Sequence, residues 1–153
     1  MMFTRQPLSR EKALAKLAAL CARAEYCTGD MEDKMRRWGL GGDDIKENIS
    51  YLVANKYVDN ARYCQAFVND KIAYNHWGRR KIEQALWMKR VPESVSAPIL
   101  DAVPEEDYIN VLKPLIASKS ATVKAESDYE RQMKLMKFAL GRGFSIDEIK
   151  QCL

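Results

Sequence analysis

The chain has 153 residues, of which 47% are hydrophobic and 30% charged, and its formal net charge at pH 7 is +4. This length and composition suit one compact domain or a few small repeats, and they exclude a wholly disordered chain. No apolar run approaches the roughly 20 residues of a transmembrane helix, and residues 1–10 lack the apolar stretch of a secretory signal, so we expect a cytoplasmic protein without membrane contact.

Hydrophobic residues recur every three or four positions along nearly the whole chain, and this period predicts helices. In the first third, Ser9 is the expected N-cap of the first helix. Asp30 is the expected cap of a second, short helix that contains Trp38 and ends at Gly39, since glycine readily adopts the conformation that terminates a helix. A glycine pair at 41–42 then precedes a third helix.

The middle third continues the helical pattern. A long apolar stripe that includes Phe67 follows Asp59, a basic helix that includes Leu86 follows Gly78, and a short element starts after Pro92. Among the aromatic and aliphatic residues of the predicted helices and their ends, we expect four to be buried. These are Trp38, Phe67, Leu86 and Phe144.

The last third predicts a further group of helices. A helix around Tyr108 is followed by a polar loop over 118–127, and a helix that ends at Gly141 is followed by a short C-terminal helix. The helix that ends at Gly141 carries one apolar stripe at helical spacing. Its members are Tyr129, Met133, Met136 and Leu140.

Two prolines interrupt the helical pattern. Pro98 and Pro114 fall inside apolar stripes, where each removes a backbone hydrogen bond and crowds the preceding turn. We therefore expect these two helices to be short, kinked or differently phased. Because no segment alternates at strand period between hairpin turns, the predicted fold class remains all-α.

The breaks between helices recur at a regular interval. Leu40, Val91 and Phe144 each follow a helix and precede a short capped helix, and they lie 51 and 53 residues apart. This spacing predicts three tandem three-helix repeats packed end to end. The repeats are expected at residues 1–56, 57–104 and 105–153. Chance similarity between amphipathic helices is the alternative explanation.

The residue types that catalyse reactions or bind metals show no recognisable arrangement. The nucleophile-elbow, phosphate-loop and dinucleotide-binding motifs are missing, and the single histidine, His76, has no evident catalytic partner. The four cysteines are Cys21, Cys27, Cys64 and Cys152. They form no C-x-x-C pair, so we expect neither zinc nor a disulfide. We predict a protein without a cofactor and without enzymatic activity; an enzyme with an unrecognised site is the remote alternative.

One segment has the composition of a binding surface. Residues 71–90 contain six basic side chains and one acid, interleaved with aromatic residues that include Tyr74 and Trp87. Cations neutralise phosphates, and aromatic rings stack on bases or anchor protein contacts. The candidate binding residues are Lys71, Trp77, Arg79, Arg80, Lys81, Lys89 and Arg90. The alternative is an ordinary solvated basic face with Trp77 packed inward.

Three of these cations begin the basic helix. Side chains of Arg79, Arg80 and Lys81 point about 100° apart, and Ile82 takes the inward direction, so at least two of the three should face solvent. Cations at a helix N-terminus oppose the helix dipole, which indicates that binding requires them there. Reversing the charges of Arg79 and Arg80 together should then leave thermal stability nearly unchanged.

Four segments form a pattern that is far more specific together than singly. They are Ala22–Thr28, Lys56–Val68, Trp77–Leu86, and Leu140–Ser145 with Ile149. In this order and at these intervals they resemble the RecX family of regulatory proteins, and the resemblance covers most of the chain. Two positions depart from the family pattern. Asn60 stands where an acid is usual, and Arg90 replaces the glycine that usually ends the helix.

The resemblance implies an elongated, curved molecule of three tandem three-helix repeats. It also implies binding along the groove of the RecA–DNA filament, inhibition of strand exchange and ATP hydrolysis by RecA, and a role in DNA repair, recombination and the SOS response. The regulator itself would be no enzyme, and we expect a monomer. DNA phosphates within the filament are a second expected contact. The alternative is a helical nucleic-acid-binding module that acts on DNA without RecA.

Overall fold

The computed structural model describes residues 6–153, and over this range the chain forms helices joined by short loops, without a β-strand. The all-α prediction is therefore confirmed for these residues. Residues 1–5 lie outside the described range. They belong to the predicted first repeat and to the N-terminal segment that was compared with a secretory signal.

Within residues 6–153 the helices fall into three consecutive groups of three. Repeat 1 consists of α1 (Arg10–Cys21), α2 (Thr28–Arg37) and α3 (Gly42–Ala54); repeat 2 of α4 (Asn60–Ala73), α5 (Arg79–Met88) and α6 (Glu93–Asp101); and repeat 3 of α7 (Glu105–Thr122), α8 (Asp128–Gly141) and α9 (Ile146–Cys152). In repeat 1, α1 and α2 both pack on α3, and in each of the other repeats all three helices contact one another. Helices α4 and α7 also touch across two repeats.

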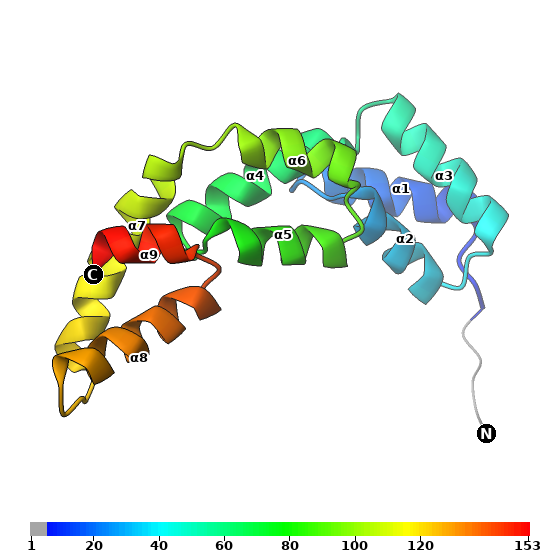
Figure 1. The fold of residues 1–153 in the computed structure, drawn as a ribbon. Helices are drawn as coiled ribbons and strands as arrows, with labels where there is room; N and C mark the ends of the chain where they lie inside the picture. Colours follow the sequence, from blue (N-terminus) through cyan, green and yellow to red (C-terminus); the bar gives the residue numbers. More distant parts are fainter. Residues whose placement is uncertain (1–5) are drawn as a thin grey trace, which may run out of the picture.

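The three repeats follow one another along an elongated, curved arch (Figure 1), as the family resemblance implied. The middle helices α8, α5 and α2 lie in a row along its inner side. The first turn of α5 hydrogen-bonds to the end of α8, and the first turn of α2 lies against the end of α5. In repeats 2 and 3, the C-terminal end of the middle helix therefore contacts the N-terminal end of the middle helix of the preceding repeat.

Local capping explains where several helices begin. Ser9 is the N-cap of α1, as the sequence predicts, and Asp59 is the N-cap of α4; both side chains accept backbone N–H groups of the first turn. The expected cap at Asp30 is wrong. Cys27 is the N-cap of α2, and Asp30 lies in the first turn, where its carboxylate accepts the N–H of Cys27 at 3.3 Å.

The three equivalent positions that follow the middle helices adopt the same structure. The backbone N–H groups of Leu40, Val91 and Phe144 each donate to a carbonyl five residues earlier, at 3.0–3.2 Å. All three side chains are buried. The residues before them have positive φ: Gly39 at 85°, Arg90 at 60° and Gly143 at 96°. The repeating breaks in the sequence are therefore repeated helix ends.

The buried apolar side chains form two separate clusters. One lies mainly in repeat 1 and includes Leu17 and Leu52. The other runs through repeats 2 and 3 and includes Leu86 and Phe144. Cys27 of repeat 1 also belongs to this second cluster. Repeats 2 and 3 thus share one core, while repeat 1 has a core of its own.

Burial confirms two of the four expected core residues and corrects the others. Leu86 and Phe144 are fully buried, whereas Trp38 and Phe67 are only half-buried. A lysine covers each half-buried ring: the Nζ of Lys16 lies 5.3 Å from the centre of the Trp38 ring, and the Nζ of Lys71 lies 5.2 Å from that of Phe67. Both aromatic rings therefore lie at the edge of the core rather than inside it.

The apolar stripe that the sequence shows on α8 is not the buried side of this helix. Tyr129, Met133 and Leu140 are exposed, and Met136 is half-buried. The buried residues of this helix are Leu135 and Ala139. Apolar side chains occur on more than one side of α8, so packing against α7 and α9 decides which side is buried.

The prolines do not end their helices. Pro98 lies inside the nine-residue helix α6, which fits the expectation of a short helix. Helix α7, by contrast, has 18 residues and continues past Pro114 to Thr122. Helix α7 reaches Thr122, so the polar loop expected over 118–127 is shorter than predicted.

Candidate functional site

The basic helix α5 begins at the junction of repeats 2 and 3, where two glycines let the backbones meet. The N–H of Gly78, the N-cap, donates to the carbonyl of Arg142 at 2.8 Å, and the N–H of Arg80 donates to that of Gly143 at 3.1 Å. A side chain at Gly78 would overlap the backbone of Gly143 and Phe144. The first turn of α5, with its cations, is therefore held firmly against the end of α8.

Trp77 lies directly before this turn, half-buried between two lysines. The Nζ of Lys71 on α4 and the Nζ of Lys81 on α5 lie 4.9 and 4.8 Å from the centre of its ring. Both distances are within the range of cation–π attraction. Neither lysine forms an ion pair within residues 6–153, so both charges remain available to a partner.

Arg80 extends this charged region to the solvent. Its side chain is exposed, whereas those of Arg79 and Lys81 are half-buried, so only one of the three cations of this turn is fully solvent-facing. Arg80 has no ion pair within the described residues. The backbone hydrogen bond to Gly143 holds its position in the turn.

The basic region continues onto repeat 3 through residues that the sequence analysis did not identify. The guanidinium carbon of Arg142 and the Nζ of Lys119 lie 5.3 and 5.1 Å from the centre of the Phe138 ring. Arg142 also donates to the carbonyl of Asn75, two residues before Trp77, at 3.3 Å. We call the combined set the basic surface: Lys71, Trp77, Arg80, Lys81, Lys119, Phe138 and Arg142. The i, i+4 spacing of Phe138 and Arg142 was the available sequence signal.

Arg79 does not belong to the basic surface as a free cation. Its Nε donates to Glu83 at 2.5 Å and its Nη2 to Asp101 at 2.6 Å. The hydrogen bonds to Glu83 and then Asp101 raise the pKa of Arg79 above its ordinary value. Charge reversal at Arg79 would bring three carboxylates together, so we now expect this change to lower stability, whereas the sequence alone predicts nearly unchanged stability.

Lys89 and Arg90 lie at the other end of α5, about 12 Å along the helix from Lys81. The Nζ of Lys89 pairs with Asp30 at 2.8 Å, and the guanidinium of Arg90 pairs with Asp33 at 2.9 Å. Both acids belong to α2. These two candidate residues therefore connect repeat 2 to repeat 1 and are not brought together with the cations around Trp77.

The cysteines and acids of the described chain form no evident reactive centre. Within residues 6–153 no three His, Cys, Asp or Glu side chains converge as metal ligands, and all four cysteines are free. Burial raises the pKa of the Cys27 and Cys64 thiols, so both remain protonated at neutral pH and lack the thiolate that reactive cysteines use. Over the same range, no helix combines the length and apolarity that crossing a bilayer requires.

Two models of one protein family match the chain. The first, described as the second three-helix domain of RecX, matches residues 59–97. The other, described as the third three-helix domain of RecX, matches residues 105–153. Together they cover more than half of the chain, and they fall on the two repeats that share one core.

Whole-chain comparisons give the same result. The regulatory protein RecX of Vibrio parahaemolyticus is 28% identical over 136 residues, which are 88% of this chain and 84% of that protein. The regulatory protein RecX of Chlorobium limicola is 26% identical over 145 residues, 95% of this chain and 89% of that protein. The crystal structure of RecX from Lactobacillus salivarius has the same fold, with a TM-score of 0.84 at 19% identity over 94% of this chain and 93% of that one.

Proposed function

The chain belongs to the RecX family, and from this premise we propose that it is a regulatory protein that binds the RecA–DNA filament. Bound there, it inhibits ATP hydrolysis and strand exchange by RecA, and so affects DNA repair, recombination and the SOS response. It acts in the cytoplasm as a monomer, by binding and not by catalysis. The names of its relatives support the regulatory role.

The observation that carries the filament contact is the pair of unpaired lysines on either side of Trp77. Lys71 and Lys81 come from different helices, yet both ammonium groups lie within 5 Å of one indole ring. Arg80 adds an exposed positive charge beside them. A set of fixed cations next to an aromatic ring suits a partner that carries phosphates, because binding releases the counterions of the phosphates.

The arrangement of the repeats supports an extended contact. The middle helices lie in a row along the inner side of the arch (Figure 1), so one molecule presents a long, curved face. The basic surface spans repeats 2 and 3 on α4, α5, α7 and α8. We infer that the protein lies along the filament rather than touching it at one point, as repeat proteins do with extended partners.

The same cations favour one second candidate, a helical module that binds DNA without RecA. Phosphate contacts alone would give binding to naked DNA that weakens steeply with salt. A regulator of the filament should instead bind RecA-coated DNA far more tightly than naked DNA. The ratio of these two affinities therefore separates the candidates.

The test measures binding of the labelled protein to RecA assembled on single-stranded DNA, to naked single-stranded DNA and to duplex DNA. We expect the filament to bind at least about tenfold more tightly than either naked DNA, which corresponds to about 1.4 kcal/mol. The double variant Arg80→Glu, Lys81→Glu should weaken filament binding and restore ATP hydrolysis by RecA. Arg23→Glu, which reverses one exposed charge in repeat 1, is the control. Equal affinity for filament and naked DNA would favour the DNA-binding module.

A further inference from the structure

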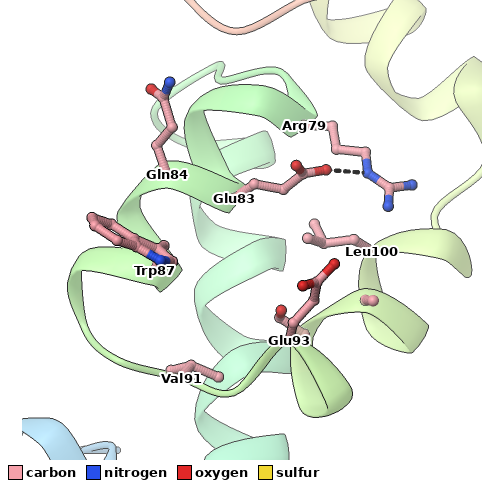
Figure 2. Close-up of a pocket in the computed structure, with 9 residues that line it drawn as sticks. Arg79, Glu83, Gln84, Trp87, Val91, Glu93 and Leu100 are labelled. Atoms are coloured by element: carbon pink, nitrogen blue, oxygen red, sulfur yellow. Dashed lines mark hydrogen bonds and ion pairs between the residues drawn. The ribbon is translucent and has the colours of Figure 1, made fainter.

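The side of α5 that faces α6 carries a groove that the proposed function leaves unused. The groove has a volume of about 350 Å³ and opens to solvent (Figure 2). Its lining combines an apolar floor, an exposed indole and two carboxylates. The residues that matter are Val91, Ala97, Leu100, Trp87, Glu83 and Glu93.

Trp87 is the most unusual member of this lining. Its side chain is 76% exposed, and the neighbouring Met88 is 69% exposed. Figure 2 shows the indole at the rim of the groove, on α5. Large exposed apolar side chains contribute little to the stability of the free protein, whereas tryptophan beside a pocket is the residue type that most often dominates binding energy in protein interfaces.

The charges of the groove exclude a phosphate and favour a cation. Arg79 is the only basic residue of the lining, and Glu83 and Asp101 both pair with it. Glu93 forms no ion pair or side-chain hydrogen bond with any residue of the range 6–153, and it faces the groove from α6 in Figure 2. The charged residues of the lining, Arg79, Glu83 and Glu93, give a formal charge of −1, opposite in sign to the basic surface.

We propose that this acidic groove binds a protein segment that presents an arginine or lysine among apolar side chains, and, resting on the proposed function, that the segment belongs to RecA. The cation of the segment stacks on the Trp87 indole and pairs with Glu93. Its aliphatic stem and apolar neighbours cover Ala97 and Leu100. The filament is then held at two places of opposite charge, its protein in the groove and its phosphates on the basic surface.

The first experiment measures the affinity of variants for RecA filaments on single-stranded DNA. Trp87→Ala and Glu93→Lys should each weaken binding by about tenfold or more, as loss of a central anchor does. Tyr129→Ala removes an aromatic side chain of similar exposure, 74%, from α8. Glu106→Lys makes the same charge change in the first turn of α7 that Glu93→Lys makes in the first turn of α6. Both controls should bind as the parent does; equal weakening by the controls and the groove variants would overturn the proposal.

The second experiment tests the groove without RecA. A capped peptide of alternating leucine and arginine is titrated into the full-length protein, and the indole N–H resonance of Trp87, assigned by its loss in Trp87→Ala, is followed by NMR. The resonance should shift with the arginine peptide and not with a matched leucine–glutamate peptide, and Glu93→Lys should abolish the shift. If neither peptide moves the resonance, or both do equally, the groove proposal is wrong.

These outcomes separate the groove from the proposed function. If the parent fails to bind filaments, the proposed function is wrong, while the peptide titration still decides whether the groove takes a basic segment. If the parent binds filaments and the Trp87 and Glu93 variants bind equally well, the proposed function stands and the groove is not its contact. The alternative occupant of the groove is a second copy of the chain, and sedimentation velocity of the parent and of Trp87→Ala tests for it. If the parent is a dimer and Trp87→Ala is a monomer, the second copy occupies the groove and the proposal is wrong.

Discussion

At the junction of repeats 2 and 3 the closely packed backbones are joined by hydrogen bonds, whereas at the junction of repeats 1 and 2, where Gly29 also lies against the backbone of Lys89, charged side chains span the contact. The first junction contains two interrepeat backbone hydrogen bonds and lies inside one continuous apolar cluster. In the second, Lys89 pairs with Asp30 and Arg90 with Asp33. The same head-to-tail contact between middle helices is thus stabilised by backbone hydrogen bonds and apolar packing at one junction and by ion pairs at the other.

Arg90 shows how the second junction departs from the repeat pattern. It occupies the left-handed position that Gly39 and Gly143 occupy in the other repeats, with φ at 60°. A side chain costs about 1–2 kcal/mol in this conformation. The guanidinium offsets the cost with hydrogen bonds to the carbonyl of Gly29 at 3.0 Å and to Asp33 at 2.9 Å. Where the other two repeats have glycine, repeat 2 has an arginine that binds the preceding repeat.

We expect the two junctions to differ in how readily they open. Repeats 2 and 3 should unfold as one unit because they share a core, and repeat 1 should open separately because mainly polar contacts hold it. Exposed ion pairs contribute little and are screened by salt. Two buried apolar residues link the two parts: Cys27 of repeat 1 lies in the core that repeats 2 and 3 share, and Val58, just before α4, lies in the core of repeat 1.

The largest expected effect comes from the shared core. Phe144→Ala should destabilise repeats 2 and 3 together by about 3–5 kcal/mol, because Phe144 is 1% exposed and truncation leaves a cavity. Urea unfolding measures the loss, and hydrogen exchange locates it. Amides of repeat 1 should keep most of their protection; equal loss of protection in all three repeats would contradict the separation of the two cores.

Glycine substitutions compare the two junctions directly. Gly143→Ala should cost about 3 kcal/mol, since the residue has a φ of 96° and an added Cβ would lie 2.5 Å from the backbone nitrogen of Lys81. Gly29→Ala would overlap the carbonyl oxygen of Lys89 and should cost less, about 1–2 kcal/mol, because the ion-paired junction can separate. Gly42→Ala is the control, as nothing lies within 4 Å of the added atom. Urea midpoints rank the three variants, and a Gly29→Ala loss as large as that of Gly143→Ala would refute the difference.

Two substitutions at Arg90 separate backbone strain from side-chain contacts. Arg90→Ala loses the contacts to α2 and keeps the strained φ, so we expect a loss of about 1–2 kcal/mol. Arg90→Gly loses the same contacts but relieves the strain, and it should be more stable than Arg90→Ala by about 1 kcal/mol. Chemical denaturation of both variants measures the difference. Identical stability of the two would show that the left-handed conformation carries no cost at this position.

The smallest expected effect is on the single ion pair between Lys89 and Asp30. The hydrogen bond to Asp30 raises the pKa of Lys89, so the pair stabilises the folded state fully below the ordinary lysine pKa of about 10.5 and loses this contribution as pH rises through the raised value. Lys89→Met should be less stable than the parent by under about 1 kcal/mol at pH 8 in low salt. The gap in urea midpoint should shrink in 0.5 M NaCl, and it should shrink as the pH rises beyond the ordinary lysine pKa of about 10.5 and through the raised value. A gap that is unaffected by salt and pH would mean that packing, not charge, holds this residue.

The helical repeats were predictable because their signals are local. Period, caps and helix-ending glycines act within a few residues, so Asp59 and the ends before Leu40 and Phe144 could be identified from neighbouring residues alone. The buried side of α8 could not, because apolar residues lie on several sides of it, and the contacts with α7 and α9 select Leu135 and Ala139.

For the candidate site, the types of residue could be predicted from the sequence, but their partners could not. It identified a segment rich in cations and aromatic rings, and Trp77 does lie between Lys71 and Lys81. The packing of the repeats brings Asp101 to Arg79, where it helps neutralise the guanidinium, and brings Lys89 and Arg90 to the acids of α2. Those partners lie 22 to 59 residues away along the chain. Whether a charged side chain is paired depends on which other side chains the packing of the repeats brings within hydrogen-bond distance of it. The local sequence pattern does not contain this information, because the partners come from other helices.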